Sequence, residues 1–236
     1  MYIISPMREI VLDTETTGTN AEGGDRIVEI GCVELVNHMP TGKSYQVYLN
    51  PECTMSEEVI KIHGITNESL VDKPKFAEIA DDFLAFIGED KLVIHNAPFD
   101  MRFLNMELKR ANRPCLDFDR AIDTLVMARK KYPGAQASLD ALCKRFGVDA
   151  SRRTKHGALL DSELLAEVYL AMILDKELKF SQHTEIKEKK DVLKNVSRET
   201  LQPRTFQIDA SELEAHEQFV GKIKNNLWQI SAVENK

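Results

Sequence analysis

Two carboxylates separated by a single residue stand near the N-terminus, after a short apolar stretch. The stretch Arg8–Leu12 is rich in β-forming residues, and Asp13, Thr14 and Glu15 follow it directly. Residues i and i+2 of an extended strand point to the same side, so Asp13 and Glu15 would present their carboxylates together. Two like charges held close are unfavourable without a cation, and hard divalent ions take oxygen ligands of this kind. The pattern indicates a divalent metal site, although a capped turn ending at Gly18 would also account for it.

Two further acidic residues occur where helices are expected to begin. Asp100 lies just after the apolar stretch 92–94, in a segment where Asn96 suits an N-cap. Asp161 comes five residues after His156, which favours a loop position for His156 and the first turns of the next helix for Asp161. Acids at helix N-termini commonly serve only the helix dipole, so neither motif indicates a site by itself. A loop histidine, however, is free to approach a substrate, and its neutral imidazole can accept a proton near pH 7.

The elements expected to position these residues follow a definite order along the chain. Strand-like stretches with short connections come first, which indicates an antiparallel meander; helical patterns then alternate with short apolar strands, which indicates parallel crossovers. The expected strands are Arg8–Leu12, Ile27–Val36, Ser44–Leu49, Leu92–Ile94 and Ala121–Leu125, with a turn at Pro40, Thr41 and Gly42. The expected helices are Phe76–Ile87, Phe99–Ala111, Leu139–Phe146 and Leu159–Leu174. The predicted fold is α/β, with a mixed sheet flanked by helices.

The bulk properties restrict the class of function. With 236 residues, 43% of them hydrophobic, the chain can form a sizeable core. The net charge of −7 argues against a protein that wraps long stretches of nucleic acid, but it is compatible with an enzyme that grips a strand end. The four cysteines are scattered without a C-x-x-C pair, which argues against zinc and disulfide frameworks. Because no apolar stretch approaches a membrane span, we expect a soluble, cytoplasmic protein with no membrane partner.

The composition changes towards the C-terminus. Apolar residues become sparse over 179–204, which is typical of a solvated linker. The segment 210–228 then regains a helical apolar pattern that is too small to form its own core, and Ser211 with Glu214 predicts a capping box. Such an element usually needs a partner surface, for which Trp228 is a natural anchor. The expected divisions are a domain at 1–176, a flexible linker at 177–204 and a helical tail at 205–236.

In chain order, the motifs D-x-E, D and H-x-x-x-x-D resemble the DEDDh family of 3′–5′ exonucleases, within the ribonuclease H-like superfamily. The resemblance covers about residues 8–174, and the ordered set is specific although each motif alone is weak. It implies a ribonuclease H-like fold. It also implies a metal-dependent enzyme that removes mispaired nucleotides from DNA 3′ ends as 5′-monophosphates, proofreading for a replicative polymerase.

The same resemblance implies a role for each residue of the set. Two divalent metal ions, Mg²⁺ with Mn²⁺ as a substitute, would be bound by the four carboxylates. Asp13 would bridge both ions, and Glu15 and Asp161 would complete the site of one. Asp100 would serve the other ion, and His156 would take the proton from the attacking water.

Further contacts are expected on the same resemblance. Thr16, His63 and Asn96 would bind the 3′-terminal nucleotide, although His63 is equally consistent with a loop histidine before a glycine turn. The tail, with its Leu227-Trp228 pair, resembles the segment that tethers such an exonuclease to its polymerase. A sliding-clamp contact near Gln182 has little support, because the surrounding residues lack the aromatic side chain of a good clamp-binding motif.

Two rival functions stay open. An RNA-trimming exonuclease of the same superfamily would carry the same catalytic residues, but such enzymes generally end near the catalytic domain, whereas this chain continues for about sixty residues. A non-catalytic scaffold subunit would have no need to keep repelling carboxylates together. The intact set of five residues therefore favours an enzyme.

Overall fold

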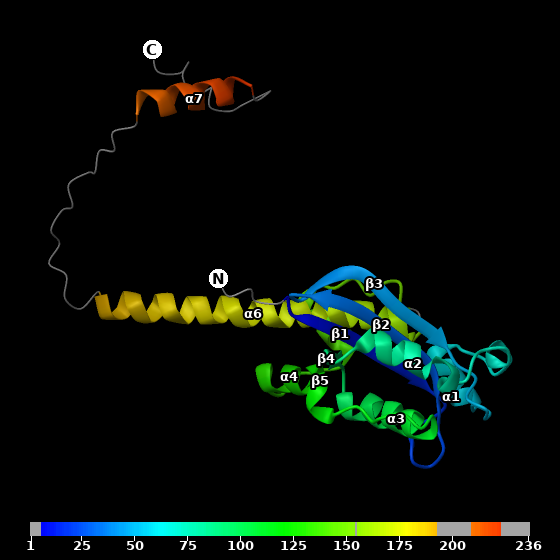
Figure 1. The fold of residues 1–236 in the computed structure, drawn as a ribbon. Helices are drawn as coiled ribbons and strands as arrows, with labels where there is room; N and C mark the ends of the chain where they lie inside the picture. The colour runs from blue at the N-terminus through cyan, green and yellow to red at the C-terminus, as the bar shows by residue number, and fades with distance from the viewer. Residues whose placement is uncertain (1–5, 154, 193–208, 223–236) are drawn as a thin grey trace. The chain divides into compact units, whose positions relative to one another are not determined.

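The computed structural model describes residues 6–153, 155–192 and 209–222. The chain divides into two compact units, residues 1–184 and 185–236. In the first unit, helices cover a five-stranded sheet (Figure 1). The strands are β1 Arg8–Thr16, β2 Ile27–Val36, β3 Met39–Tyr48, β4 Lys91–Ile94 and β5 Ala121–Asp123. The helices are α1 Glu57–His63, α2 Phe76–Ile87, α3 Ala97–Arg110, α4 Thr124–Lys131, α5 Leu139–Phe146 and α6 Ala158–Val192, with 3₁₀ turns at Glu68–Leu70 and Phe118–Arg120.

The sheet combines two kinds of strand pairing. Its order is β3-β2-β1-β4-β5. The pairs β1–β2 and β2–β3 are antiparallel, whereas β1–β4 and β4–β5 are parallel. The predicted mixed sheet, an antiparallel meander followed by parallel strands, is therefore confirmed. Strand β1 lies at its centre, where both kinds of pairing meet.

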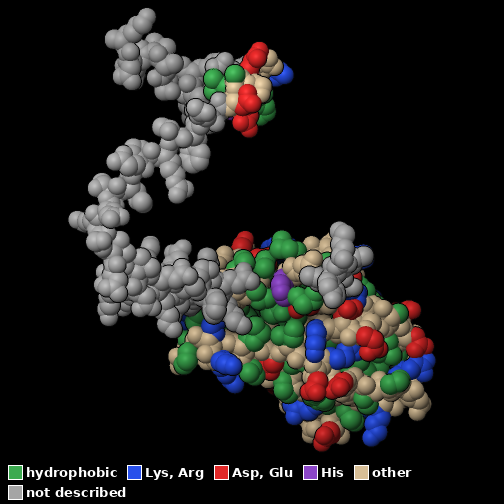
Figure 2. All heavy atoms as spheres, turned by 60° about the vertical axis from the view of Figure 1, so that its left-hand side comes forward, with side chains coloured by type: hydrophobic (Ala, Val, Ile, Leu, Met, Phe, Trp, Pro, Cys, Tyr) green, Lys and Arg blue, Asp and Glu red, His purple; other side chains and the backbone are tan. Residues whose placement is uncertain are grey.

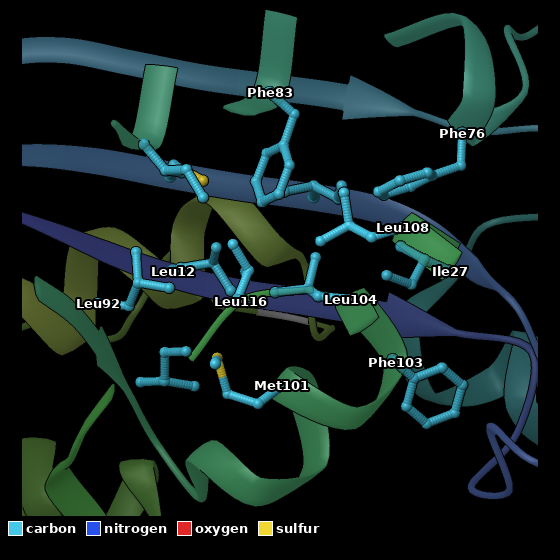
Figure 3. Packing of buried hydrophobic residues seen from close by; sticks show 14 of the residues in the cluster. Leu12, Ile27, Phe76, Phe83, Leu92, Met101, Phe103, Leu104, Leu108 and Leu116 are labelled. Atoms are coloured by element: carbon cyan, nitrogen blue, oxygen red, sulfur yellow. The ribbon is translucent and has the colours of Figure 1, made fainter. Parts of the chain in front are cut away.

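Alternating residues of β1 face two separate hydrophobic layers. Ile10 and Leu12 pack with apolar side chains of α2 and α3, such as Phe83 and Leu104 (Figure 3). Val11 packs on the opposite side, with residues of α4, α5 and α6. By the same alternation, the odd-numbered acids that follow Val11 on β1 lie on the side of α6. Burying one such Leu, Ile or Phe contributes about 1.5–3 kcal/mol, so the two layers fix the orientation of β1 firmly.

The connection between β2 and β3 differs from the predicted turn. Asn37 and His38 form it, with φ of 51° and 65°, which is the requirement of a type I′ hairpin turn. The predicted turn residues instead lie within β3. Pro40 is tolerated there because β3 is an edge strand, and Gly42 has φ of 86° close to a shift in the β2–β3 register. The prediction was wrong because a histidine at a left-handed position carries little signal.

Two short helices were not anticipated from the pattern. Helix α1 begins after Ser56, whose side chain accepts a hydrogen bond from the backbone of Val59, and ends before Gly64 with φ of 79°. His63 is therefore the last residue of a helix and is not in a loop. Helix α4 begins after Asp123, which caps it, so β5 is shorter than expected. Helix α1 has only seven residues, too few turns to show a clear period, and the apolar residues of α4 are consecutive at its start and do not follow a helical spacing.

Helix α6 extends further than the pattern indicated. It continues to Val192, so the backbone of 177–192, which we expected to be linker, is helical. This stretch is rich in Lys and Glu, which are good helix formers although they provide few apolar positions. The predicted boundaries and the flexibility of the linker stay predictions. In the described part of the chain, no helix is long and apolar enough to cross a membrane.

The second unit contains the helix α7, Ala210–Gly221. Its N-cap is Asp209, whose side chain accepts a hydrogen bond from the backbone of Ser211. The predicted capping box, with Ser211 as the cap, is therefore wrong by two residues, because an aspartate caps as well as a serine. Trp228 and the rest of 223–236 lie outside the described residues, so the predicted anchor stays a prediction.

Candidate active site

A pocket of about 280 Å³ lies between the carboxyl end of β1 and the start of α6. It is lined by Asp13, Thr14, Glu15, His95, Ser138, Leu139, Asp140, Arg153, His156 and Asp161. Four of the five residues predicted to be catalytic are in this set: Asp13, Glu15, His156 and Asp161. Asp13 and Glu15 come from β1, whereas His156 and Asp161 come from the loop before α6 and the first turn of α6, more than 130 residues later in the chain.

The charged groups of this pocket lie close enough to share a cation. Glu15, His156 and Asp161 each offer one ligand atom, and these atoms lie within 4.8 Å of one another. Burial, followed by the charges of Asp100, Glu15 and Asp161, raises the pKa of Asp13 well above its usual range. Burial likewise raises the pKa of Glu15 to about 8. Acids that cannot all ionise together are the setting in which a bound divalent cation is stabilising, so the donor set fits a hard metal ion.

Asp100 lies on α3 and is 3% exposed. Its Oδ1 accepts hydrogen bonds from the backbone N–H of Thr14 at 3.1 Å and from Thr14 Oγ1 at 2.7 Å. Burial raises the pKa of Asp100 to about 7, and these hydrogen bonds oppose the rise. These hydrogen bonds to Thr14, which stands between Asp13 and Glu15, place the fifth predicted residue beside this cluster.

A close contact between β2 and α6 brings Asp161 to the site. Gly31 is paired with Asp13 in the sheet and lies on the same side of it. A Cβ at Gly31 would lie 2.2 Å from the backbone of Ala158 and Leu159. The missing side chain therefore allows the first turn of α6 to lie directly on the sheet, which carries Asp161 towards the carboxylates of β1.

Two hydrogen bonds fasten this contact. The hydroxyl of Ser162 donates to the carbonyl of Gly31 at 2.9 Å. The backbone N–H of Ala158 donates to the Glu29 side chain at 3.2 Å, and Glu29 is 1% exposed. Glu29 therefore acts as a side-chain acceptor for an N–H at the start of α6. Neither Ser162 nor Glu29 was predicted, because neither belongs to an acidic or histidine motif with a recognisable spacing.

His156 precedes α6 in a loop, as predicted. Its backbone N–H donates to the carbonyl of Ile62 in α1 at 3.2 Å, which ties the loop to that helix. The Nδ1 atom lies 3.4 Å from an oxygen of Asp161, and the side chain is 48% exposed. The hydrogen bond with Asp161 raises the pKa of His156, whereas burial and the charge of Arg153 oppose the rise. An exposed imidazole beside a carboxylate can accept a proton from a water molecule in the pocket.

Arg153 was not predicted to belong to the site. Its guanidinium binds both oxygens of Asp161, at 2.5 and 2.7 Å, and reaches Asp140 at 2.5 Å. It also lies 2.8 Å from Nδ1 of His156. Burial alone would raise the pKa of Asp161, but hydrogen bonds from His156 and Arg153 lower it. The only signal in the sequence was a basic residue three positions before the candidate base.

The three predicted substrate-binding residues do not line this pocket. Thr16 is buried, and its hydroxyl donates to the carbonyl of Gly18 at 2.6 Å. Asn96 is exposed and precedes α3 with φ of 66°, but its side chain makes no capping hydrogen bond. His63 is 6% exposed, and its Nδ1 accepts a hydrogen bond from the backbone of Ile65.

The distribution of charge on the surface of the first unit can be compared with the prediction that the protein does not wrap long stretches of nucleic acid. On the face shown in Figure 2, acidic, basic and apolar side chains are interspersed, without a continuous basic area. This face therefore lacks the continuous basic strip that proteins wrapping nucleic acid present.

Comparison with known proteins places the chain in a family. Residues 10–169 match the family described as "Exonuclease". The DNA polymerase III subunit epsilon of Rickettsia felis is 48% identical over 225 residues, covering 93% of this chain and 98% of that protein. The protein of the same name from Escherichia coli K12 is 52% identical over 172 residues, covering 70% of this chain and 71% of that protein.

Solved structures confirm the predicted fold. Exonuclease X in complex with 5′ overhanging duplex DNA superposes with a TM-score of 0.55 and 27% identity, covering 71% of this chain and 92% of that chain. The nuclease domain of 3′hExo, a DEDDh family member bound to rAMP, superposes with a TM-score of 0.63 and 22% identity, covering 73% of this chain and 94% of that chain. The prediction of a nuclease is confirmed together with the fold. The chain belongs to the exonuclease family, and its relatives there include the epsilon subunits of bacterial DNA polymerase III.

Proposed function

We propose that this chain is the proofreading 3′–5′ exonuclease subunit of a bacterial DNA polymerase III. It removes mispaired nucleotides from the 3′ end of DNA as 5′-monophosphates. The observation that carries the proposal is the cluster of Glu15, His156 and Asp161, whose ligand atoms lie within 4.8 Å of one another beside Asp13. A scaffold subunit would have no use for such a cluster, because the acids repel one another when no cation is bound.

The carboxylates are proposed to hold two divalent metal ions, Mg²⁺ or in its place Mn²⁺. Asp13 would contribute to both sites, Glu15 and Asp161 would complete one, and Asp100 would serve the other. Oxygen-rich sites of this kind suit both metals. When bound, the two ions stabilise the attacking and leaving oxygens of the phosphodiester. The raised pKa values of Asp13, Glu15 and Asp100 support the assignment, because burial makes their charged forms costly, neighbouring acids add to that cost at Asp13 and Glu15, and a cation would offset it.

His156 is proposed to act as the general base. The imidazole takes a proton from a water molecule, whose oxygen forms a bond to the terminal phosphorus. The bond between that phosphorus and the 3′ oxygen of the preceding nucleotide breaks, and this oxygen takes a proton from solvent. The products are a nucleoside 5′-monophosphate and a strand that is one nucleotide shorter, with a 3′ hydroxyl. The exposure of His156 and its place on a loop support this role.

Thr16, His63 and Asn96 are proposed to bind the terminal nucleotide. His63 has the strongest support, because the structure gives its buried Nε2 atom no hydrogen-bond partner. Since Nδ1 already accepts a hydrogen bond, a neutral His63 carries its proton on Nε2, where it can donate to a sugar or phosphate oxygen. Selection of mismatches needs no reading of bases, because a mispaired end frays more readily and a single-strand site captures it.

The tail is proposed to bind the alpha subunit of DNA polymerase III in the cytoplasm, with Trp228 as the anchor. Two observations support a docking role. Helix α7 exposes the apolar side chains of Leu213 and Phe219, which are 50% and 66% exposed. The similarity to the Rickettsia felis protein also extends over 98% of that protein. A contact with the sliding clamp is not part of this proposal.

One assay tests the activity and separates it from RNA trimming. Labelled DNA primers with a mismatched 3′ end and an RNA of the same sequence are incubated with the protein in EDTA, Mg²⁺ or Mn²⁺. We expect release of nucleoside monophosphates from DNA with either metal and none in EDTA. Faster release from RNA than from DNA would favour the trimming function, and release in EDTA would contradict the metal site.

A further inference from the structure

The pocket contains a positive charge of its own. Among the described residues that line it, Arg153 is the one arginine or lysine, and its side chain is only 8% exposed. Its Nε and Nη2 atoms each contact a different oxygen of Asp161, at 2.5 and 2.7 Å, in the two-pronged arrangement that a guanidinium prefers. Asp140 holds the remaining nitrogen at 2.5 Å. The arginine is therefore fixed between two carboxylates, one of which is a proposed metal ligand.

This arrangement is in conflict with metal binding at the same carboxylate. Both oxygens of Asp161 accept hydrogen bonds from the guanidinium. Asp161 also belongs, with Glu15 and His156, to the group of residues whose ligand atoms could hold a metal ion. A divalent ion that binds Asp161 must share its oxygens with the guanidinium or displace it, because each oxygen already accepts one of these contacts. It must also tolerate the fixed positive charge of Arg153, and the repulsion is strong where solvent is largely excluded.

We propose that Arg153 is a resident counter-cation that holds Asp161 in the metal-free site and sets the metal affinity by competing with the divalent ion for this carboxylate. The inference rests on the metal site proposed above and adds a residue outside the family motifs. Without Arg153, Asp161 is a buried carboxylate that lacks its guanidinium partner. The metal-free protein should then be less stable, and the ion should bind more tightly.

The neighbouring residue supplies a matched control. Arg152 carries the same charge one position earlier, but its side chain is 71% exposed, and it lies 3.7 Å from the half-exposed Glu163. Neutralising Arg152 removes the same charge from the chain without removing a contact to Asp161. A difference between the two positions therefore reports the contact and not the net charge.

The experiment compares full-length wild-type protein with Arg153→Gln, Arg153→Lys and Arg152→Gln. Mn²⁺ binding is measured without DNA by titration calorimetry and electron paramagnetic resonance, and the Tm is measured in EDTA and at saturating Mn²⁺. We expect the Kd for Mn²⁺ to fall by about tenfold in Arg153→Gln, as when one competing charged contact is lost. Arg153→Lys should show a smaller fall in the Kd for Mn²⁺, because a lysine keeps the positive charge but cannot contact both oxygens of Asp161 as a guanidinium does. Arg152→Gln should match wild type.

The Tm gives a second readout. In EDTA it should fall for Arg153→Gln, and the rise caused by Mn²⁺ should be larger than in wild type. An affinity for Mn²⁺ that is unchanged or weaker in Arg153→Gln would overturn the inference. If this variant does not fold, Arg153→Lys decides, and wild-type affinity in Arg153→Lys would overturn it.

Asp161→Asn separates this inference from the metal site on which it depends. Mn²⁺ binding that is as tight in Asp161→Asn as in wild type would contradict the proposed site, and the inference with it. If Asp161→Asn binds weakly, the double variant completes a thermodynamic cycle. The effect of Arg153→Gln should then disappear, because the contested carboxylate is absent. An effect of the same size in both backgrounds would show that Arg153 acts elsewhere.

Discussion

Three acidic residues of this site are buried in positions that disfavour their charged forms. Asp13, Glu15 and Asp100 all have raised pKa values, chiefly because they are buried. A protein that maximised its metal-free stability would replace such residues, since each is buried beside others of the same charge. Their presence around the carboxyl end of β1 is a cost that a bound cation would offset.

Asp13→Ala tests the importance of the proposed bridging ligand. Nuclease activity should fall by more than about 100-fold, because even residues that only orient a metal ligand commonly contribute 10–100-fold. The metal-free Tm should be unchanged or higher, since one repelling carboxyl is removed. Activity is measured as nucleotide release from a labelled primer, and circular dichroism checks the fold. Wild-type activity in the purified variant would contradict the site.

The role of His156 has a pH signature. A base must be neutral, so the rate should rise with pH across the range in which His156 loses its proton. The hydrogen bond with Asp161 raises this pKa above the ordinary value of 6.5, so the rise should lie at higher pH wherever that contact persists. His156→Ala should lose activity by about 10²–10⁴-fold and still bind Mn²⁺. Loss of Mn²⁺ binding, with an unchanged pH profile for the residual rate, would make His156 a ligand instead.

The sequence indicated the candidate catalytic residues but not the residues that hold them in place. Asp13, Glu15, His156 and Asp161 could be found because carboxylates and a histidine in this fixed order are typical of one family of nucleases. Arg153 and Glu29 act through contacts with partners 8 and 129 positions away, and no local pattern encodes such contacts. The helix that carries His63 was not predicted, because the short helix α1 shows too weak a periodicity.

At the scale of elements, the site depends on the distance between β2 and α6. Only β1 carries two of the acids, and α6 must approach the neighbouring strand closely to add Asp161. Gly31 allows this approach, and Ser162 fastens it. The strands and longer helices were predictable from their periodicity, whereas this contact was not. A glycine inside a strand indicates close approach in general terms without naming the partner.

Gly31→Ala should therefore impair catalysis without touching a catalytic side chain. The added Cβ would lie 2.2 Å from the backbone of α6, which cannot give way as a side chain can. We expect a loss of stability on the order of 1–3 kcal/mol from overpacking. We also expect a fall in kcat of about 100-fold, from a displacement of Asp161 on the order of 1 Å. Denaturant unfolding and single-strand hydrolysis measure the two effects.

Gly157→Ala is the matched control for this substitution. It lies in the loop beside His156, and an added Cβ there meets no atom within 4 Å. This variant should keep near-wild-type stability and activity. Equal losses in both variants would mean that the loop, and not the contact between β2 and α6, is the sensitive feature.

At the scale of the whole molecule, the site links stability to pH and metal. The pKa values of Glu15 and Asp100 are about 8 and 7 in the folded protein, against ordinary values of 4.5 and 3.8. At pH values between the ordinary and the folded-state pKa of each group, the folded state binds more protons than the unfolded chain. The free energy of unfolding therefore falls as pH rises through this range. The Tm in EDTA should be lower at pH 8 than at pH 5. Mn²⁺ should raise it more at pH 8, where the ligands must give up fewer protons to bind the ion.

Glu15→Gln provides the check on this linkage. The variant removes a group that is protonated in the folded protein but ionised in the unfolded chain across most of this pH range, so the decline of Tm with pH in EDTA should become shallower. The same decline in wild type and Glu15→Gln would show that other groups set the pH dependence.

The two units of the chain are expected to divide catalysis from attachment. Buried residues of α6 such as Tyr169 and Met172 belong to the core of the first unit, and Asp175 accepts a hydrogen bond from Tyr132 at 2.5 Å. A truncation after Thr184, the boundary between the units, keeps all of these contacts. Hydrolysis of a short single strand should then stay within about twofold of wild type, because surface changes away from the core have small effects. Loss of hydrolysis in this truncated protein would mean that the tail is part of the catalytic unit.

Binding to the polymerase alpha subunit, in contrast to hydrolysis, should depend on the tail. Phe219 of the tail is 66% exposed and would gain burial on a partner, and large aromatic residues dominate the energy of interfaces. In a pull-down with the polymerase alpha subunit, the full-length chain should be retained and the truncated chain lost, with Trp228→Ala and Phe219→Ser between them. Tethering raises the effective concentration of the nuclease at a primer end, so proofreading by the complex should fall with retention while single-strand hydrolysis does not. Equal retention of all four proteins would place the polymerase contact on the first unit and remove the reason for proposing a tethering tail.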